Sequence, residues 1–185
     1  MVVQTCLKKK FFERSPEEVA KDLLGKILVR KVEDVYMKAR IVETEAYFGP
    51  EDPASRASKG RNKISEKMWA EPGTILVYNV HKYQMLNFVT QSKEEPSAVL
   101  IRALESLNFD ARTKGPGLLT DALGIDKEIH GQNVLSSNEI WIEGPEGEEE
   151  IYEIEDSFRV GVTEDLNERY RFFIKGNRFV SRPKV

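Results

Sequence analysis

The chain lacks the features that mark a secreted or membrane-spanning protein. Its 185 residues include one cysteine, Cys6, so no internal disulfide can form and a reducing, intracellular setting is expected, prokaryotic cytoplasm or eukaryotic nucleus. No apolar run approaches the roughly 20 residues that span a bilayer, and we expect neither membrane contact nor a secretory signal. With only His81 and His130 beside Cys6, a structural zinc site has too few ligands, whereas a carboxylate-bound metal remains open.

Net charge is also low, at −3, which argues weakly against a polyanionic partner. The charge is unevenly spread, because residues 139–156 hold nine acidic and no basic residues. The stretch 56–67 holds five basic residues and one acidic residue. Two solvated loops of opposite charge explain this pattern as well as a nucleic-acid footprint does, and both interpretations stay open.

Local signals divide the chain into short strands with few helices. Apolar residues make up 40% and charged residues 32%, an ordinary globular composition, and we expect one domain over residues 1–185. Most connections are too short for crossover helices, so the pattern favours a single α+β domain with a mostly antiparallel sheet. Helices are predicted at 16–24 and 118–123, with the first capped by Ser15 and ended by Gly25. Strands are predicted at 27–32, 36–48, 75–80, 85–89, 98–104, 140–142, 159–162 and 171–174, with a loop at 49–73 and a turn at 81–84.

Glu43, Glu45 and Tyr47 alternate along the strand at 36–48 and are expected on one inward face. A carboxylate that loses water there has a raised pKa, which suits a general base near neutral pH. Alternatively, the strand twists out of the core and the glutamates are solvated. Their separation of roughly 7 Å along a strand also resembles the carboxylate pair of an inverting glycosidase or half of a metal site.

Several further residues are candidates for the same site. Arg102 lies inside the apolar strand at 98–104 and needs a partner if it is buried, although it can also reach solvent from the strand end. Gly115 and Gly117 flank Pro116 at a helix start, where free amides can bind phosphate, but most such segments are only turns. Tyr78 and Asn87 lie on the predicted hairpin, where packing roles are as common as binding roles.

Several strings in one order resemble a single family, the alkyladenine (3-methyladenine) DNA glycosylases of the human alkyladenine glycosylase type. Together they span most of the chain, and the second is the most specific. The strings are LLGKILVR (23–30), RIVETEAYFGPEDPAS (40–55), PGTILVY (72–78), VLIRALE (99–105), GPGLLTDALGI (115–125), RVGV (159–162) and RFFIKG (171–176).

The resemblance implies a single mixed domain around a curved antiparallel sheet, with flanking helices and a protruding β-hairpin. The hairpin would enter the minor groove of double-stranded DNA, and a damaged purine would be flipped into a pocket. Such enzymes cleave the N-glycosidic bond of alkylated or deaminated purines at the start of base-excision repair. They need no metal and no cofactor, and we expect a monomer.

Residue by residue, the resemblance assigns Glu45 as the general base and Arg102 as the arginine that helps to hold the attacking water. It assigns Tyr47 as the aromatic that stacks on the flipped base, Tyr78 as a second pocket tyrosine and Asn87 as the pocket asparagine. Glu43 becomes a neighbour of the base. Val160 or Val162 would supply a backbone carbonyl near the water.

The chain also departs from the family pattern. Arg56 stands where the family usually has a histidine opposite the stacking tyrosine. The hairpin carries His81 and Tyr83 in place of a tyrosine wedge, and either is a candidate to enter the duplex. Leu118 replaces a lysine that would contact phosphate. Arg61 and Lys63 in the basic stretch are expected phosphate contacts.

Two alternatives to a working glycosylase follow from these departures and from the glutamate pair. One is a catalytically weak nucleic-acid-binding module of the same fold, which the altered hairpin and Leu118 favour and intact Glu45 and Arg102 oppose. The other is a carbohydrate hydrolase that uses Glu43 and Glu45, which leaves the other matching strings unexplained.

Overall fold

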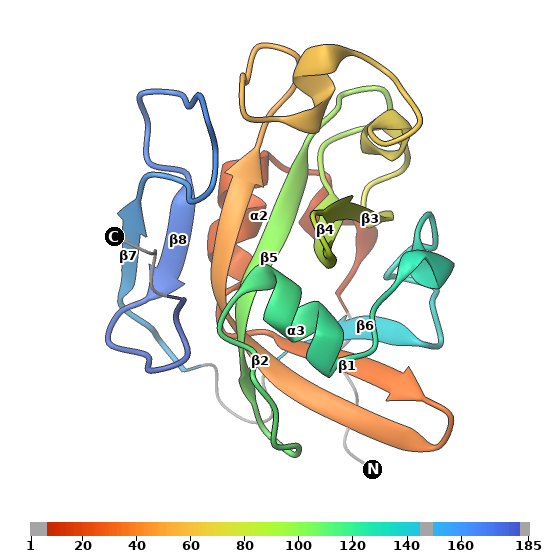
Figure 1. Ribbon diagram of the computed structural model, residues 1–185, viewed down its shortest axis with the longest axis vertical. Coiled ribbons are helices and arrows are strands. Elements are labelled where there is room, and N and C mark those ends of the chain that lie inside the picture. Colours follow the sequence, from red (N-terminus) through yellow and green to blue (C-terminus); the bar gives the residue numbers. More distant parts are fainter. Residues whose placement is uncertain (1–6, 145–149, 182–185) are drawn as a thin grey trace.

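The computed structural model describes residues 7–144 and 150–181, and Figure 1 shows a curved sheet with short helices and long loops around it. Cys6 and part of the acidic stretch at 139–156 lie outside these residues. The helices are α1 (Lys9–Phe12), α2 (Pro16–Leu23) and α3 (Pro116–Ala122), with 3₁₀ turns η1 (Arg56–Lys59), η2 (Glu66–Trp69) and η3 (Lys127–Ile129). The strands are β1 (Ile27–Val32), β2 (Val35–Tyr47), β3 (Ile75–Val80), β4 (Tyr83–Val89), β5 (Ala98–Ser106), β6 (Ile140–Glu143), β7 (Ile154–Ser157) and β8 (Arg171–Ile174).

The strands of the described residues form one eight-stranded sheet in which every pair is antiparallel. The main path runs β3-β4-β5-β2-β1-β6, and β8 pairs with β2 beside β7. This confirms the predicted α+β fold with a curved, mostly antiparallel sheet. The long strand β2 lies at its centre, because β1, β5 and β8 all pair with it.

Helix α2 begins and ends where its local chemistry predicts. The Ser15 side chain accepts from the Glu18 N–H while the Glu18 carboxylate accepts from Ser15, a capping box that satisfies two N–H groups at the helix start. Gly25 follows the helix at φ 86°, in the left-handed region that glycine adopts without steric cost. The helix packs its apolar face on β2 and β5, and the Thr44 hydroxyl donates to the Ala20 carbonyl at 2.8 Å.

Both faces of β2 are covered from Ile41 to Ala46, so charged residues in this segment have no exposed surface. The β2–β5 register shifts on either side of Glu43, an irregularity that simple alternation does not predict. The expectation that Glu43 and Glu45 lie in the interior is confirmed, and the solvated alternative is wrong.

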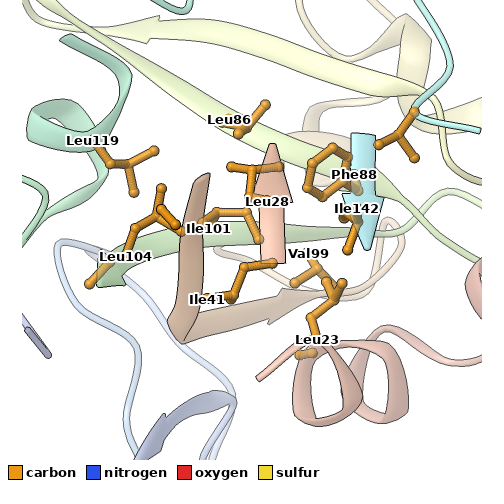
Figure 2. Close-up of a cluster of buried hydrophobic side chains, with 14 of the residues drawn as sticks. Leu23, Leu28, Ile41, Leu86, Phe88, Val99, Ile101, Leu104, Leu119 and Ile142 are labelled. Atoms are coloured by element: carbon orange, nitrogen blue, oxygen red, sulfur yellow. The ribbon is translucent and has the colours of Figure 1, made fainter. Parts of the chain in front are cut away.

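The main core lies where β2, β5, β4 and β1 meet α2 and α3, and Figure 2 shows its centre around Ile41, Phe88 and Ile101. A second cluster anchors the loop at 49–73. It contains Ala57, Met68, Leu76, Val89 and Ala98, with Trp69 and Tyr78 packed against it. This cluster explains how a long connection keeps a defined shape beside the sheet.

The structure corrects three boundaries. The hairpin turn contains only His81 and Lys82, because Tyr83 and Gln84 already pair with β3 as part of β4. Residues 159–162 form a loop and not a strand, because Gly161 has φ 78° and the Arg159 side chain turns to distant carboxylates. The acidic stretch is no simple loop, since β6 and β7 lie within it.

Candidate active site

A cavity of about 660 Å³ opens between β2, β3, β5, the loop through η1 and residues 160–164. Four of the predicted site residues line it, and they come from segments far apart in the sequence. They are Tyr47, Arg56, Tyr78 and Arg102. The fold therefore brings four of the six predicted catalytic and base-binding residues together around one cavity.

Glu45 lies directly behind this wall and has no exposed surface. Its Oε1 accepts the Val160 N–H at 2.7 Å and meets Nη1 of Arg102 at 3.3 Å. Its Oε2 accepts the Tyr47 hydroxyl at 2.7 Å. Each of these partners also lines the cavity, so the carboxylate lies next to the cavity wall.

Burial raises the pKa of the Glu45 carboxyl above its ordinary value, although Arg102 and the Val160 N–H act in the opposite direction. A carboxylate with a raised pKa is a stronger base and takes a proton from water more readily. Burial and Glu45 raise the pKa of the Tyr47 hydroxyl well above its ordinary value. Tyr47 therefore stays protonated and acts as a donor to Glu45.

Arg102 is buried and paired, so the alternative in which it reaches solvent is wrong. Its Nε donates to Glu43 Oε1 at 2.9 Å while Nη1 faces Glu45. Glu43 also accepts from Arg171 Nε at 2.7 Å and from Ser181. Because its oxygens are occupied by these donors, Glu43 is a partner of the arginines and cannot readily act as a second catalytic acid.

Tyr47 is backed by a buried ion pair that sequence reasoning did not predict. The Arg159 guanidinium lies 4.6 Å from the centroid of the Tyr47 ring and donates to both oxygens of Asp52, at 2.6 and 2.8 Å. It also contacts Asp165 and donates to the Ala46 carbonyl at 2.9 Å. Burial alone would raise the pKa of Asp52, but Arg159 and the Phe48 and Ala54 N–H groups together outweigh burial and hold that pKa below its ordinary value.

Tyr78 and Arg56 form the opposite part of the cavity wall. The Arg56 guanidinium lies 4.7 Å from the Tyr78 ring centroid, an arrangement in which a cation is attracted to the ring face. Asn87 is buried beside them and does not line the cavity, because its amide donates to the Leu76 and Met85 carbonyls, both at 3.2 Å.

The β3–β4 hairpin presents one of its two wedge candidates at its tip. His81 occupies the turn at φ 53°, a strained conformation for a residue with a side chain. Tyr83 lies one step into β4, and its ring packs on Gly117 of α3 so closely that an added Cβ there would lie 2.3 Å from Tyr83 Cγ. Gly117 is thus buried beneath Tyr83. Of the two glycines predicted to bind phosphate, Gly115 is the more accessible.

The two basic residues predicted to touch phosphates differ in their surroundings. Arg61 pairs with Glu94 at 2.8 Å and lies 5.2 Å from the Trp69 ring centroid. Lys63 is exposed in the loop between η1 and η2.

Sequence reasoning missed several residues that hold Glu43 and Tyr47 in place. Arg159, Asp52, Arg171 and Ser181 reach the site through partners more than 100 positions away. Val160 also donates its N–H to Glu45, a contact that sequence reasoning did not predict. Arg159 and Arg171 each stand between apolar neighbours in the sequence, which indicates that each needs an acidic partner. This pattern does not show that the partners are Asp52 and Glu43.

The described residues contain no group of three histidine, cysteine, aspartate or glutamate side chains able to hold a metal ion. In the same part of the chain, no helix is long and apolar enough to cross a membrane.

The sequence is similar to one known family and to several named proteins. The family model for methylpurine-DNA glycosylase matches residues 10–178. A relative from Aeropyrum pernix is 43% identical over 97% of this chain and 94% of its own length. Relatives from Clostridium perfringens strain SM101 and Legionella pneumophila strain Corby are 38% and 41% identical, each over 95% of this chain and 98% of their own length. All three carry the name "Putative 3-methyladenine DNA glycosylase".

These matches, with the buried glutamate behind an aromatic cavity, define the chain as a DNA glycosylase, an enzyme that hydrolyses N-glycosyl bonds in DNA. The chain belongs to the methylpurine-DNA glycosylase family.

Proposed function

We propose that the chain excises alkylated or deaminated purines from double-stranded DNA, with Glu45 as the general base and water as the nucleophile. The observation that carries the proposal is the position of Glu45, a fully buried carboxylate held directly behind a cavity with tyrosines in its wall. Glu45 Oε2 accepts the Tyr47 hydroxyl, and a carboxylate oxygen has a second lone pair that can accept a water proton.

The reaction requires the damaged nucleotide to leave the base stack, because its glycosidic bond is inaccessible inside the duplex. In the cavity, Tyr47 offers a ring face to the flipped purine. Glu45 takes a proton from water as the water oxygen bonds to C1′, and the electrons of the broken glycosidic bond leave with the purine. Arg102 lines the cavity and contacts Glu45, so its guanidinium is placed to orient that water.

The tip of the hairpin is the proposed wedge. His81 is the better candidate, because Tyr83 is held against Gly117 and is not part of the turn. Minor-groove proteins insert a side chain between bases to hold an opened duplex. A strained residue at the turn, where glycine or asparagine would fit without cost, indicates that the His81 side chain is retained for contact and not for the turn.

Arg56 is the proposed determinant of lesion preference. It lines the cavity and its guanidinium is always charged, so a cationic alkylpurine meets a fixed positive charge beside Tyr78. Neutral lesions such as hypoxanthine or 1,N6-ethenoadenine avoid that repulsion. We infer a preference for neutral purine lesions within the proposed range.

The remaining proposed properties follow from a DNA substrate. We propose one glycosylase domain over residues 1–185, acting as a monomer in the intracellular compartment that holds DNA. Asn87 was expected to be the pocket asparagine; because it does not line the cavity and contacts Tyr78, we propose that it acts on the pocket through Tyr78. Gly115 is proposed to approach the DNA backbone beside α3.

The test is single-turnover base release from duplexes that contain hypoxanthine, 1,N6-ethenoadenine or 3-methyladenine. Glu45→Gln keeps the side-chain shape but removes the base, so we expect release to fall by about 10²–10⁴-fold with lesion binding retained. If the variant keeps more than about a tenth of the wild-type rate, Glu45 is not the base. If the wild type binds lesions and releases no base, the chain is a binding module of the same fold.

A further inference from the structure

Glu43 is held by an unusual number of charged and polar donors for a residue that the proposed reaction does not use. It lies on β2 with no exposed surface. Its Oε1 accepts from Arg102 Nε at 2.9 Å, Arg171 Nε at 2.7 Å and Ser181 Oγ at 2.8 Å. Its Oε2 accepts the Ser181 N–H at 2.6 Å. One buried carboxylate therefore joins β2, β5, β8 and the segment that follows β8.

The Arg102 guanidinium is shared between two carboxylates. Nε faces Glu43 at 2.9 Å, and Nη1 faces Glu45 at 3.3 Å, so the closer and better directed contact is with Glu43. Arg102 Nε donates a hydrogen bond to Glu43, whereas Nη1 forms the longer ion pair with Glu45. Glu45 thus receives only part of the charge of its nearest cation.

We propose that Glu43 is a positioning residue for base release, because it draws the charge of Arg102 away from Glu45 and holds the guanidinium where Nη1 meets the base. The inference deepens the proposed function, since it rests on Glu45 as the proton acceptor. Arg171 and Ser181 act on Glu45 only through Glu43. They hold Glu43 in place, and Arg171 is itself fixed by the Ser157 hydroxyl and the Ser181 carbonyl, both at 2.9 Å.

The charged and titratable groups around Glu45 come from every element packed against it. They are Glu43 and Tyr47 on β2, Tyr78 on β3 with Arg56 beside its ring, Arg102 on β5, Arg171 on β8 opposite Glu45, and Arg159 with Asp52 and Asp165 behind Tyr47. The charge of Arg159 is balanced by its ion pairs with Asp52 and Asp165, so it has little effect on Glu45. Glu43 and Arg102 act on Glu45 directly, whereas Arg171 acts on it through its contact with Glu43.

Two substitutions change this balance in opposite directions. Glu43→Gln removes a nearby negative charge and leaves the whole charge of Arg102 on Glu45, so the pKa of Glu45 falls. Arg171→Gln removes the competing cation from Glu43, which then neutralises more of Arg102, so the pKa of Glu45 rises. The double variant loses one charge of each sign, so the pKa of Glu45 in it should lie between its values in the two single variants.

The experiment measures the pKa of Glu45 in two independent ways. One is the acid limb of the pH profile for single-turnover release from a duplex that carries an N7-methylated purine, whose positive charge lets the base leave without protonation. The other is a ¹³C NMR titration of labelled glutamate side chains without DNA, with the Glu45 signal assigned by its loss in Glu45→Gln. In Glu43→Gln, we expect both the apparent pKa of the acid limb and the NMR pKa of Glu45 to fall by about one unit. In Arg171→Gln, we expect both values to rise.

Glu143→Gln is the matched control, because it removes a carboxylate that is 5% exposed and ion-paired with Lys38 on the far side of β1. It should leave the Glu45 pKa unchanged. If Glu43→Gln fails to fold, Arg171→Gln and the charge-balanced double variant still give the predicted order of pKa values. A purely structural role for Glu43 would lower stability in these variants without moving the pKa of Glu45.

The possible outcomes separate this inference from the proposed function. If base release proceeds and neither the limb nor the NMR pKa moves, Glu43 does not position the base and the inference is overturned. If the NMR pKa moves as predicted and the wild type releases no base from any lesion, the coupling stands and the proposed function fails.

Discussion

Replacing Asp52 by asparagine tests the buried ion pair that supports the cavity from behind. Oδ2 of Asp52 accepts from Arg159 Nη1 at 2.6 Å and from the Phe48 N–H at 2.9 Å. Oδ1 accepts from Arg159 Nη2 at 2.8 Å and from the Ala54 N–H at 3.0 Å. An asparagine amide has one oxygen, so in either orientation its NH₂ group replaces an oxygen that accepts two of these bonds. Two donors then lose their acceptor, and Arg159 keeps only Asp165 as a carboxylate partner.

Removing one partner of a buried ion pair costs about 3–5 kcal/mol, because the other charge stays buried. For a chain of this length, each kcal/mol lowers Tm by about 2–4 °C. We therefore expect Asp52→Asn to lower Tm by about 6–20 °C in thermal unfolding followed by circular dichroism. Asp22→Asn is the matched control, since Asp22 pairs with Arg14 at 2.6 Å but is 53% exposed. Its loss should be about 0–1 kcal/mol.

The effect should also depend on pH, with a sign that follows from the lowered pKa of Asp52. A carboxyl whose folded pKa lies below its unfolded value stabilises fully above the unfolded pKa, about 3.9 for aspartate. That contribution is lost as pH falls through the folded pKa. The Tm difference between wild type and Asp52→Asn should be constant near neutral pH and narrow below about pH 4. A Tm loss no larger than that of Asp22→Asn, or a difference that does not narrow, would refute the reasoning.

The remaining predictions concern DNA. His81→Ala should weaken extrusion of a fluorescent base analogue with little loss of Tm, whereas Tyr83→Ala should lower Tm first because its ring packs on α3; the reverse result would make Tyr83 the wedge. Binding should weaken steeply with salt, and neutralising Arg61 and Lys63 should reduce the slope of log K against log salt by about one per phosphate contact; an unchanged slope means that this loop does not touch DNA. Arg56→His should raise the ratio of cationic to neutral lesion release in single-turnover assays, and a parallel change in both rates would instead make Arg56 a phosphate contact.

Elements whose boundaries depend on local chemistry were predictable from the sequence. Ser15 and Glu18 form the predicted capping box, Gly25 ends the helix, and β1 spans the predicted residues. The segment 159–162 has the alternating sequence pattern of a strand. It forms a loop, because Gly161 is in the left-handed conformation and the Arg159 side chain pairs with the distant Asp52. Strand β7 was missed because most of its residues are polar, so its sequence lacks the apolar pattern of a strand. The apolar residues of this strand pair lie on β8.

The sequence indicated several residues of the site, but not the contacts that hold them together. Alternation placed Glu45 and Tyr47 inside, and the charge in an apolar strand marked Arg102 as needing a partner. Nothing in the local pattern pairs Arg159 with Asp52, because those residues are 107 positions apart and meet only through tertiary packing. Asn87 is a further case, since its amide is taken up by carbonyls of its own hairpin.

The contacts of Glu43 and Glu45 span the chain in a way that bears on its synthesis. Glu45 receives the Val160 N–H across 115 positions, and Glu43 receives Arg171 and Ser181 across 128 and 138 positions. A ribosome makes these residues in order, so for most of translation β2 carries two carboxylates without their late partners. Contacts this distant in sequence form slowly, because long loops must close first. If Glu45 is the base, as proposed, the nascent chain completes the contacts of Glu43 and Glu45 only after the polypeptide beyond β8 has emerged, and a truncated product would release no bases from DNA.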